Sequence, residues 1–229
     1  MIERIRPKIK ILLADDHPIL RQGVRQLLER QLDFEVVAEA GDGEEAVKLT
    51  DELRPDVVVM DVGMPKLSGL EATRQIKAKN PGIAVLILTI YDDEEYIFGL
   101  LEGGAAGYLL KSAYGDELVQ AIRAVRNGEF VLHPMIGQRL VKRAANCRSK
   151  PIRLDAMERL TAREVQVLRL AARGMSNTQI ASKLGIKVRT VKGHMADIFA
   201  KMKVGSRTEA VLRALKQGWF GLEDVNLGG

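Results

Sequence analysis

Five polar side chains suited to binding a cation and a phosphoryl group each follow an apolar run typical of a buried strand. They are three carboxylates, a hydroxyl and an amine, namely Asp15, Asp16, Asp61, Thr89 and Lys111. In a parallel α/β sheet the carboxyl ends of the strands lie along one edge, so residues placed there converge although they are far apart in the chain. The sequence therefore predicts one pocket that holds all five.

The chemistry of this predicted pocket is phosphoryl transfer. Either of the two adjacent aspartates, together with Asp61, offers the oxygen ligands that Mg²⁺ prefers, and the carbonyl of Gly63 is a further candidate ligand. Like charges packed together are costly without a cation, which also favours a metal here. Asp61 follows the predicted middle strand and is the best placed nucleophile. Lys111 and the hydroxyl of Thr89 would contact the oxygens of its phosphoryl group.

The pocket depends on the elements that must position it. Continuous apolar runs predict five strands, at residues 9–14, 34–40, 56–60, 84–88 and 107–110. Helical patterns between and after them predict helices at residues 18–31, 43–53, 70–79, 94–102 and 116–126. This alternation is typical of an α/β fold, a (βα)5 doubly wound parallel sheet with helices on both faces.

Charge divides the chain in two. Residues 1–130 hold 16 basic and 23 acidic side chains, a net charge of −7, while residues 131–229 hold 19 and 7, a net charge of +12. We therefore predict an acidic domain at 1–128, a linker at 129–155 with one possible short helix at 136–145, and a basic domain at 156–229. The positive charge of the basic domain favours nucleic acid as its partner.

The basic domain is predicted to be all-helical. Three capping boxes, which begin at Thr161, Ser176 and Ser206, each open a helical apolar pattern. A further helix fits residues 188–202, and glycines follow the first two helices where they should end. The sequence thus predicts a small all-α domain of four helices.

The first domain resembles a known family in four motifs. They are Leu13-Ala-Asp-Asp-His-Pro18, Met60-Asp-Val-Gly-Met-Pro65, Leu88-Thr89 and Gly107-Tyr-Leu-Leu-Lys111. With them, residues 8–127 resemble the receiver domain of two-component response regulators. The resemblance implies that Asp61 accepts a phosphoryl group from a sensor histidine kinase in the presence of Mg²⁺. It also implies that Thr89 and Tyr108 form a switch, in which Thr89 moves toward the phosphoryl group and Tyr108 turns into the space it leaves.

The second domain resembles the helix-turn-helix of the LuxR/FixJ type over about residues 160–215. The motifs are Leu160-Thr-Ala-Arg-Glu164, Gly174-Met-Ser-Asn177, Thr190-Val-Lys-Gly-His194 and the stretch from Lys201 to Ala210. A receiver followed by this domain is the arrangement of the NarL/FixJ response regulators. The resemblance implies that residues 188–202 form the recognition helix in the major groove of promoter DNA.

Candidate DNA contacts follow from this placement. The backbone N–H groups at the start of the preceding helix can hold a phosphate, Lys192 can donate to guanine, and Ala196 can touch only a thymine methyl. The other lysines are expected at phosphates. The full predicted set is Ser176, Asn177, Lys187, Arg189, Thr190, Lys192, Gly193, Ala196 and Lys201.

Two positions depart from the family's pattern. Ile90 stands beside the predicted pocket where a small residue is frequent, and it could slow phosphoryl transfer or hydrolysis. Lys187 stands where Ser or Thr usually caps the recognition helix, and lysine cannot cap. Either that helix begins elsewhere, or stability is given up for a phosphate contact.

The sequence predicts a phosphorylation-switched bacterial transcription regulator rather than an enzyme with turnover on an external substrate. We expect a homodimer when it is phosphorylated or bound to DNA, formed through the last helix at 207–217, where apolar Val211 and Leu215 are spaced i to i+4. Two alternatives stay open. One is a phosphatase with an aspartyl nucleophile, which would usually carry a second Asp where Gly63 stands. The other is a constitutive DNA-binding protein with a silent receiver.

The sequence also predicts a cytoplasmic protein without a membrane partner. There is no signal-peptide pattern, and no apolar run approaches the roughly 18 residues of a membrane helix. Cys147 is the single cysteine, so no intramolecular disulfide can form. The three histidines, at 17, 133 and 194, are not expected to form a metal cluster with one another.

Overall fold

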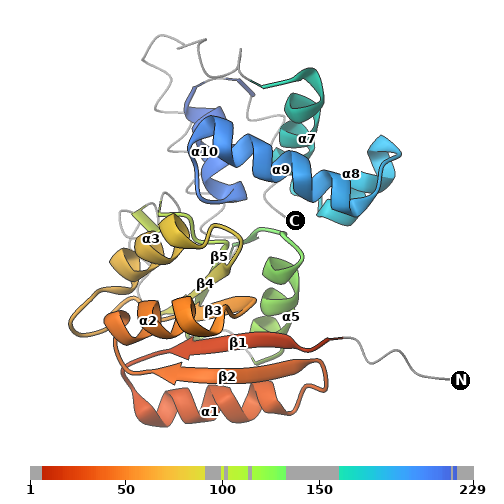
Figure 1. The fold of residues 1–229 in the computed structure, drawn as a ribbon. Coiled ribbons are helices and arrows are strands. Elements are labelled where there is room, and N and C mark those ends of the chain that lie inside the picture. The colour runs from red at the N-terminus through yellow and green to blue at the C-terminus, as the bar shows by residue number, and fades with distance from the viewer. Residues whose placement is uncertain are drawn as a thin grey trace, which may run out of the picture.

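The computed structural model of the 229-residue chain describes residues 7–90, 99–100, 103–112, 115–132, 160–217 and 219–220. These residues form two domains (Figure 1), which we call the α/β domain, up to residue 132, and the helical domain, from residue 160. Within these ranges, no helix combines the length and the apolar character needed to cross a bilayer.

The α/β domain is built on a parallel sheet with the strand order β2-β1-β3-β4-β5-β6. The strands are β1 (Ile9–Ala14), β2 (Phe34–Ala40), β3 (Val57–Met60), β4 (Ala84–Thr89), β5 (Gly107–Leu110) and β6 (Val131–Leu132). The five predicted strands are confirmed. Strand β6 was not predicted, because two residues are too few to give a strand pattern. Its pairing with β5 carries the sheet beyond the domain boundary predicted at residue 128.

Helices cover both faces of this sheet, as predicted. They are α1 (Pro18–Glu29), α2 (Gly43–Leu53), α3 (Gly69–Lys79) and α5 (Gly115–Arg126). Alternate strand residues point to opposite faces, so Leu12 and Val58 pack with α2 and α3, whereas Ile11 and Val57 pack with α1 and α5. The helix predicted at 94–102 lies mostly outside the described residues, and the one predicted at 136–145 lies wholly outside them.

The helical domain consists of four short helices around one apolar core, as predicted. They are α7 (Ala162–Ala172), α8 (Asn177–Leu184), α9 (Val188–Met202) and α10 (Arg207–Lys216). The capping boxes at Thr161 and Ser176 are both complete. At Ser206 the hydroxyl accepts from the N–H of Glu209, but the Glu209 carboxylate accepts from Gly205, one residue earlier than in a capping box.

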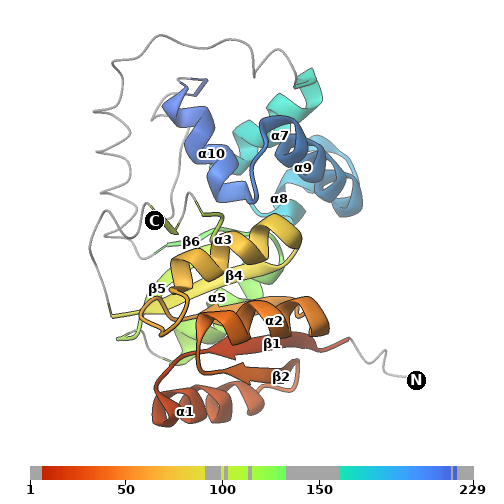
Figure 2. The ribbon, with the colours of Figure 1, turned by 60° about the vertical axis from the view of Figure 1, so that its left-hand side comes forward.

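The two domains lie against each other. In Figures 1 and 2 the helical domain sits on the side of the sheet that carries β5 and α3, while β2 and α1 lie on the far side. Leu212 of α10 packs at the edge of the apolar cluster under α2 and α3. Backbone carbonyls that follow α5 accept hydrogen bonds from side chains of the helical domain. The fold therefore leaves two distinct regions for chemistry, the carboxyl edge of the sheet and the surface around α9.

Candidate functional site

The predicted pocket lies at the carboxyl edge of the sheet. Asp15 follows β1, Asp61 follows β3, Thr89 ends β4 and Lys111 follows β5, so four neighbouring strands each deliver one side chain. The backbone fixes these positions, because the N–H of Asp61 donates to the carbonyl of Ala14 and the N–H of Lys111 donates to that of Thr89. The structure thus brings together residues that are up to 96 positions apart in the chain.

Lys111 is held between two carboxylates. Its Nζ lies 2.7 Å from Asp15 Oδ2 and 3.0 Å from Asp61 Oδ2, and all three side chains are largely buried. Burial lowers the pKa of Lys111, but the bonds to Asp15 and Asp61 outweigh burial, so its pKa stands above the ordinary value. The amine therefore stays charged at neutral pH and can meet an anionic group that arrives at Asp61.

The aspartates fit a hard divalent cation. Two buried oxygens, Asp16 Oδ1 and Asp61 Oδ1, have no hydrogen-bond partner, although buried polar atoms normally have one. Carboxylate oxygens are the ligands that Mg²⁺ prefers, so Asp16 and Asp61 would hold it, with Asp15 beside them. Gly63 lies in an exposed position two residues after Asp61.

A glycine behind the pocket was not singled out from the sequence. A Cβ on Gly69 would lie 2.0 Å from the carbonyl oxygen of Asp61, so only glycine allows the start of α3 to approach this loop. Ser68 caps α3 there, in a capping box with Glu71. That Ser-Gly-Leu-Glu pattern was the signal that could have placed the helix start against the pocket.

The two residues of the implied switch are both inside the protein. Thr89 and Tyr108 have no exposed surface, and Tyr108 is part of the apolar cluster under α2 and α3. The resemblance implied an inward turn of Tyr108 on phosphorylation. In this structure the tyrosine already occupies a buried position.

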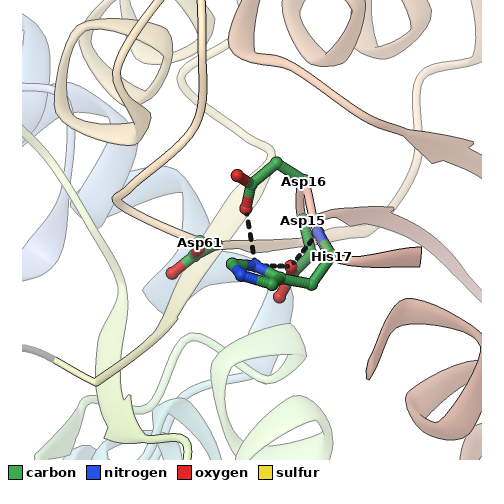
Figure 3. Close-up of side chains that lie close together, drawn as sticks. All are labelled: Asp15, Asp16, His17 and Asp61. Atoms are coloured by element: carbon green, nitrogen blue, oxygen red, sulfur yellow. Dashed lines mark hydrogen bonds and ion pairs between the residues drawn. The ribbon is translucent and has the colours of Figure 1, made fainter. Parts of the chain in front are cut away.

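One further side chain joins the pocket that sequence reasoning left out. His17 lies beside Asp15, Asp16 and Asp61, as Figure 3 shows. Its Nδ1 is 2.8 Å from Asp16 Oδ1 and 3.4 Å from Asp15 Oδ1. The signal was in the motif itself, since His17 follows the two aspartates directly.

The predicted recognition helix presents most of its candidate DNA contacts to solvent. Val191 and Ile198 are buried in the core of the helical domain, and the opposite surface carries exposed side chains at the predicted positions Lys187, Arg189, Thr190, Lys192, Gly193 and Ala196. Helix α9 begins at Val188 with Lys187 as its N-cap residue, and no side chain caps it. The alternative that the helix begins elsewhere is therefore wrong: α9 begins where predicted, without a side-chain cap.

Three other predicted DNA contacts have partners within the protein. The N–H of Ser176 donates to Gln179 Oε1 at 2.7 Å, and Asn177 Nδ2 donates to the carbonyl of Asn127 in the α/β domain at 2.9 Å. Lys201 Nζ lies 2.6 and 2.7 Å from the two carboxylate oxygens of the buried Glu164. In this arrangement these groups stabilise the protein, and their part in DNA binding stays a prediction.

Arg207, at the start of α10, connects the two domains and was not predicted. Its guanidinium donates to the carbonyl of Gly128 at 3.1 Å, to that of Ala171 at 2.8 Å and to that of Met175. Burial lowers its pKa to about 10, so the side chain is still charged at neutral pH. One buried cation therefore binds the end of α5 to two turns of the helical domain.

A cleft of about 920 Å³ separates α9 from the α/β domain. Lys192 and Ala196, two of the predicted base contacts, lie on one wall, and Lys77, Arg126 and Glu129 of the α/β domain lie on the other. Part of the surface of α9 that is predicted to read DNA, at Lys192 and Ala196, therefore faces the α/β domain, whereas Lys187, Arg189, Thr190 and Gly193 do not line the cleft.

Comparisons with known proteins agree with this geometry. Residues 11–123 match the response regulator receiver domain family, and residues 158–214 match the bacterial regulatory proteins of the luxR family. The transcriptional regulatory protein DegU of Brevibacillus brevis is 41% identical over 224 residues, which cover 93% of this chain and 95% of that protein.

Two solved structures extend the comparison. The response regulator ChrA of a heme-sensing two-component system is 39% identical with a TM-score of 0.51, over 94% of this chain and all of that one. RcsB, solved as two dimers bound to two parallel DNAs, is 25% identical with a TM-score of 0.55, over 90% of this chain and 98% of that one.

Proposed function

The chain belongs to the two-component response regulators with a LuxR-type DNA-binding domain, and from this premise we propose that phosphorylation of Asp61 controls its binding to promoter DNA. The α/β domain is the receiver, and the helical domain is the DNA-binding domain. The phosphoryl donor is a sensor histidine kinase, the partner that this family uses.

The proposed reaction takes place on the side chain of Asp61. A carboxylate oxygen attacks the phosphorus of a phosphohistidine, and the phosphorus–nitrogen bond breaks as the new phosphorus–oxygen bond forms. Lys111, already 3.0 Å from Asp61 Oδ2, can move onto a phosphoryl oxygen, and Thr89 can donate its hydroxyl to another. Mg²⁺ held by Asp16 and Asp61 would add positive charge beside these oxygens.

The observation that carries the proposal is the position of the recognition helix. Lys192 and Ala196 face the receiver across the cleft, and Asn177 is bonded to Asn127 of the receiver. A DNA duplex that contacts Lys192 and Ala196 would need the cleft and part of the space of the receiver opposite, so we propose that this closed arrangement and DNA binding exclude each other. Phosphorylation then acts by shifting the equilibrium toward an open arrangement.

Dimerisation through α10 fits the same scheme. In the closed arrangement Arg207 and Leu212 of α10 contact the receiver, so opening frees this helix for a second copy. Val211 is buried in the core of its own domain and cannot supply the contact. The variant Leu215→Asp tests whether α10 forms the dimer contact. If the oligomeric state and the operator affinity of the phosphorylated variant equal those of the wild type, α10 does not form it.

The decisive experiment measures binding to promoter fragments with and without acetyl phosphate and Mg²⁺. The wild type should bind more tightly with the phosphodonor, whereas Asp61→Ala should not respond. Glu52→Ala, at an exposed carboxylate on α2, is the control and should behave as wild type. Equal binding in all conditions favours the constitutive regulator with a silent receiver, since Ile90 is 72% exposed beside the end of β4 and could hinder phosphorylation.

A hydrolytic function has less support. An aspartyl phosphatase needs an acid/base two residues after the nucleophile, and Gly63 has no side chain. Release of nitrophenolate from a chromogenic phosphate ester at a rate that depends on Asp61, with many turnovers per molecule, would favour the phosphatase instead.

A further inference from the structure

His17 occupies a helix N-cap position without capping the helix. It precedes Pro18, the first residue of α1, and its side chain accepts no bond from the helix. Ser, Thr, Asp and Asn are preferred at such positions because their oxygens bond the free N–H groups. Its backbone N–H donates to Asp15 Oδ1 at 2.8 Å, which fixes the residue beside the pocket. The imidazole therefore does not stabilise the start of α1 by capping it.

The imidazole lies at the solvent side of the carboxylates instead, with 70% of its side-chain surface exposed. One ligand atom each from Asp15, Asp16, His17 and Asp61 can be chosen so that all four lie within 4.8 Å of one another (Figure 3). Neighbouring ligands of a cation with bonds of about 2.1 Å lie about 3 Å apart, and opposite ligands about 4.2 Å apart. His17 Nδ1 is 2.8 Å from Asp16 Oδ1 and 3.4 Å from Asp15 Oδ1, which is the spacing of neighbours.

The short approach of His17 to Asp16 does not make a hydrogen bond. Asp16 Oδ1 is buried and has no hydrogen-bond partner, although the ring nitrogen is within contact distance. Asp61 Oδ1 is also buried and without such a partner. Two carboxylate oxygens therefore lack hydrogen-bond donors, and an imidazole nitrogen lies beside one of them. A cation bound to all three atoms would satisfy them.

From this geometry we infer that His17 is a nitrogen ligand that raises the affinity of the phosphorylation pocket for transition-metal ions such as Co²⁺ and Zn²⁺ relative to Mg²⁺. The inference rests on the proposed function, since it uses the same pocket. Mg²⁺ takes oxygen ligands and gains little from imidazole, whereas Co²⁺ and Zn²⁺ bind imidazole well. His17 thus determines the selectivity of the site between cations, whereas Asp16 and Asp61 provide the affinity for any divalent cation.

The test is a titration of the full-length protein with Co²⁺, followed by the visible absorption of the ion, which reports nitrogen ligation. Mg²⁺ affinity is measured separately by calorimetry. His17→Asn should weaken Co²⁺ binding by at least about tenfold and change Mg²⁺ affinity less than about twofold. His194→Asn is the matched control, because this histidine lies on α9 away from the pocket, and it should leave both affinities unchanged.

Two results overturn the inference. If His17→Asn weakens Co²⁺ and Mg²⁺ equally, the imidazole only positions Asp16. If it changes neither affinity, His17 is a surface residue. Asp16→Asn separates these results from failure of the pocket itself, because it should weaken both ions. Unchanged Mg²⁺ affinity in Asp16→Asn contradicts the proposed metal site, whatever His17 does.

Discussion

Lys187 shows at the level of one residue how stability and DNA binding compete. Its backbone has the extended conformation of an N-cap residue, with φ −75° and ψ 148°, but its side chain gives the start of α9 no hydrogen bond. The ammonium instead lies exposed next to the predicted DNA-reading surface.

Replacing this lysine should separate the two properties. Lys187→Ser should raise the free energy of unfolding by about 1 kcal/mol, because serine caps the helix. It should also weaken DNA binding. The slope of the logarithm of the binding constant against the logarithm of salt concentration should become smaller by about one. Urea unfolding and DNA titrations at several salt concentrations measure the two effects. Lys183→Ser, at an exposed position inside α8, should give no stabilisation.

Lys77 predicts a pH dependence of stability. Its Nζ donates to the carbonyls of Pro81 and Ile83, and its side chain lies beneath Gly205 of the helical domain. Burial lowers its pKa from 10.5 to about 8 in spite of nearby Glu209. Between these two values the unfolded chain binds more protons than the folded protein, so this lysine makes stability rise as pH increases from about 8 to 10.5.

The comparison of variants isolates this lysine from other titrating groups. As pH rises through that window, the unfolding free energy of the wild type should increase relative to that of Lys77→Gln. Lys79→Gln, at an exposed position on the same helix, should differ from wild type by a constant amount. A difference for Lys77→Gln that does not vary with pH contradicts the prediction.

The sequence predicted the residues of the pocket well because strand ends share one edge whatever the details of packing. Asp61, Thr89 and Lys111 needed only correct strand assignments to be placed together. Arg207 was missed because its role comes from contacts with backbone atoms distant in the chain, and Gly69 because its role comes from a close approach to the backbone of Asp61. Periodicity carries no signal for such contacts.

At the level of elements, the end of α5 is the part of the receiver that holds the helical domain. Gly128 follows α5 with φ +78°, and its carbonyl accepts from Arg207. A Cβ on Gly128 would lie 2.5 Å from Asn177 Nδ2, so an added methyl group would push this amide away from its bond to the carbonyl of Asn127.

Gly128→Ala should therefore open the two domains and raise DNA affinity without a phosphodonor. The distance between labels on the two domains, measured by spin-label spectroscopy, should increase. Gly185→Ala is the matched control, because Gly185 also has a positive φ of +65° but has nothing within 4 Å of an added Cβ. It should carry a similar backbone strain and leave the domains closed. Equal distances in both variants would mean that this contact does not hold them together.

Elements were predictable where an apolar pattern was long enough. The five predicted strands and the predicted helices within the described residues showed several residues or turns of pattern, and their predicted bounds agree closely with the structure. Strand β6 has only two residues, and its place is set by pairing with β5. The contact of α10 with the receiver was unpredictable for another reason: it uses Arg207 and Leu212, whereas the pattern in the sequence was the pair Val211 and Leu215.

For the whole molecule, the phosphorylation pocket and the contact between the domains lie at opposite ends of the sheet. Asp61 and Thr89 stand at carboxyl ends of strands. The domain contact involves Asn127 and Gly128 after α5, and residues near the amino ends of β3 and β4. A phosphoryl group cannot break that contact by touching it, so its effect must pass through the elements between them. One of these is α3, which begins against Asp61 at Gly69 and carries Lys77 beneath Gly205 of the helical domain.

The closed cleft over α9 has a consequence for the direction of control. Because receiver and duplex compete for one surface, the free energy that links phosphorylation to DNA binding acts equally in both senses. Promoter DNA is then an effector of the receiver. At saturating operator and at equilibrium with a fixed donor, the ratio of phosphorylated to unphosphorylated Asp61 should rise by the factor by which phosphorylation tightens DNA binding. Phosphate-affinity gels with and without operator measure this, and Lys192→Ala, which should bind the operator weakly, should show less of it at the same DNA concentration. Each promoter would thus help to determine the fraction of its bound regulator that is phosphorylated.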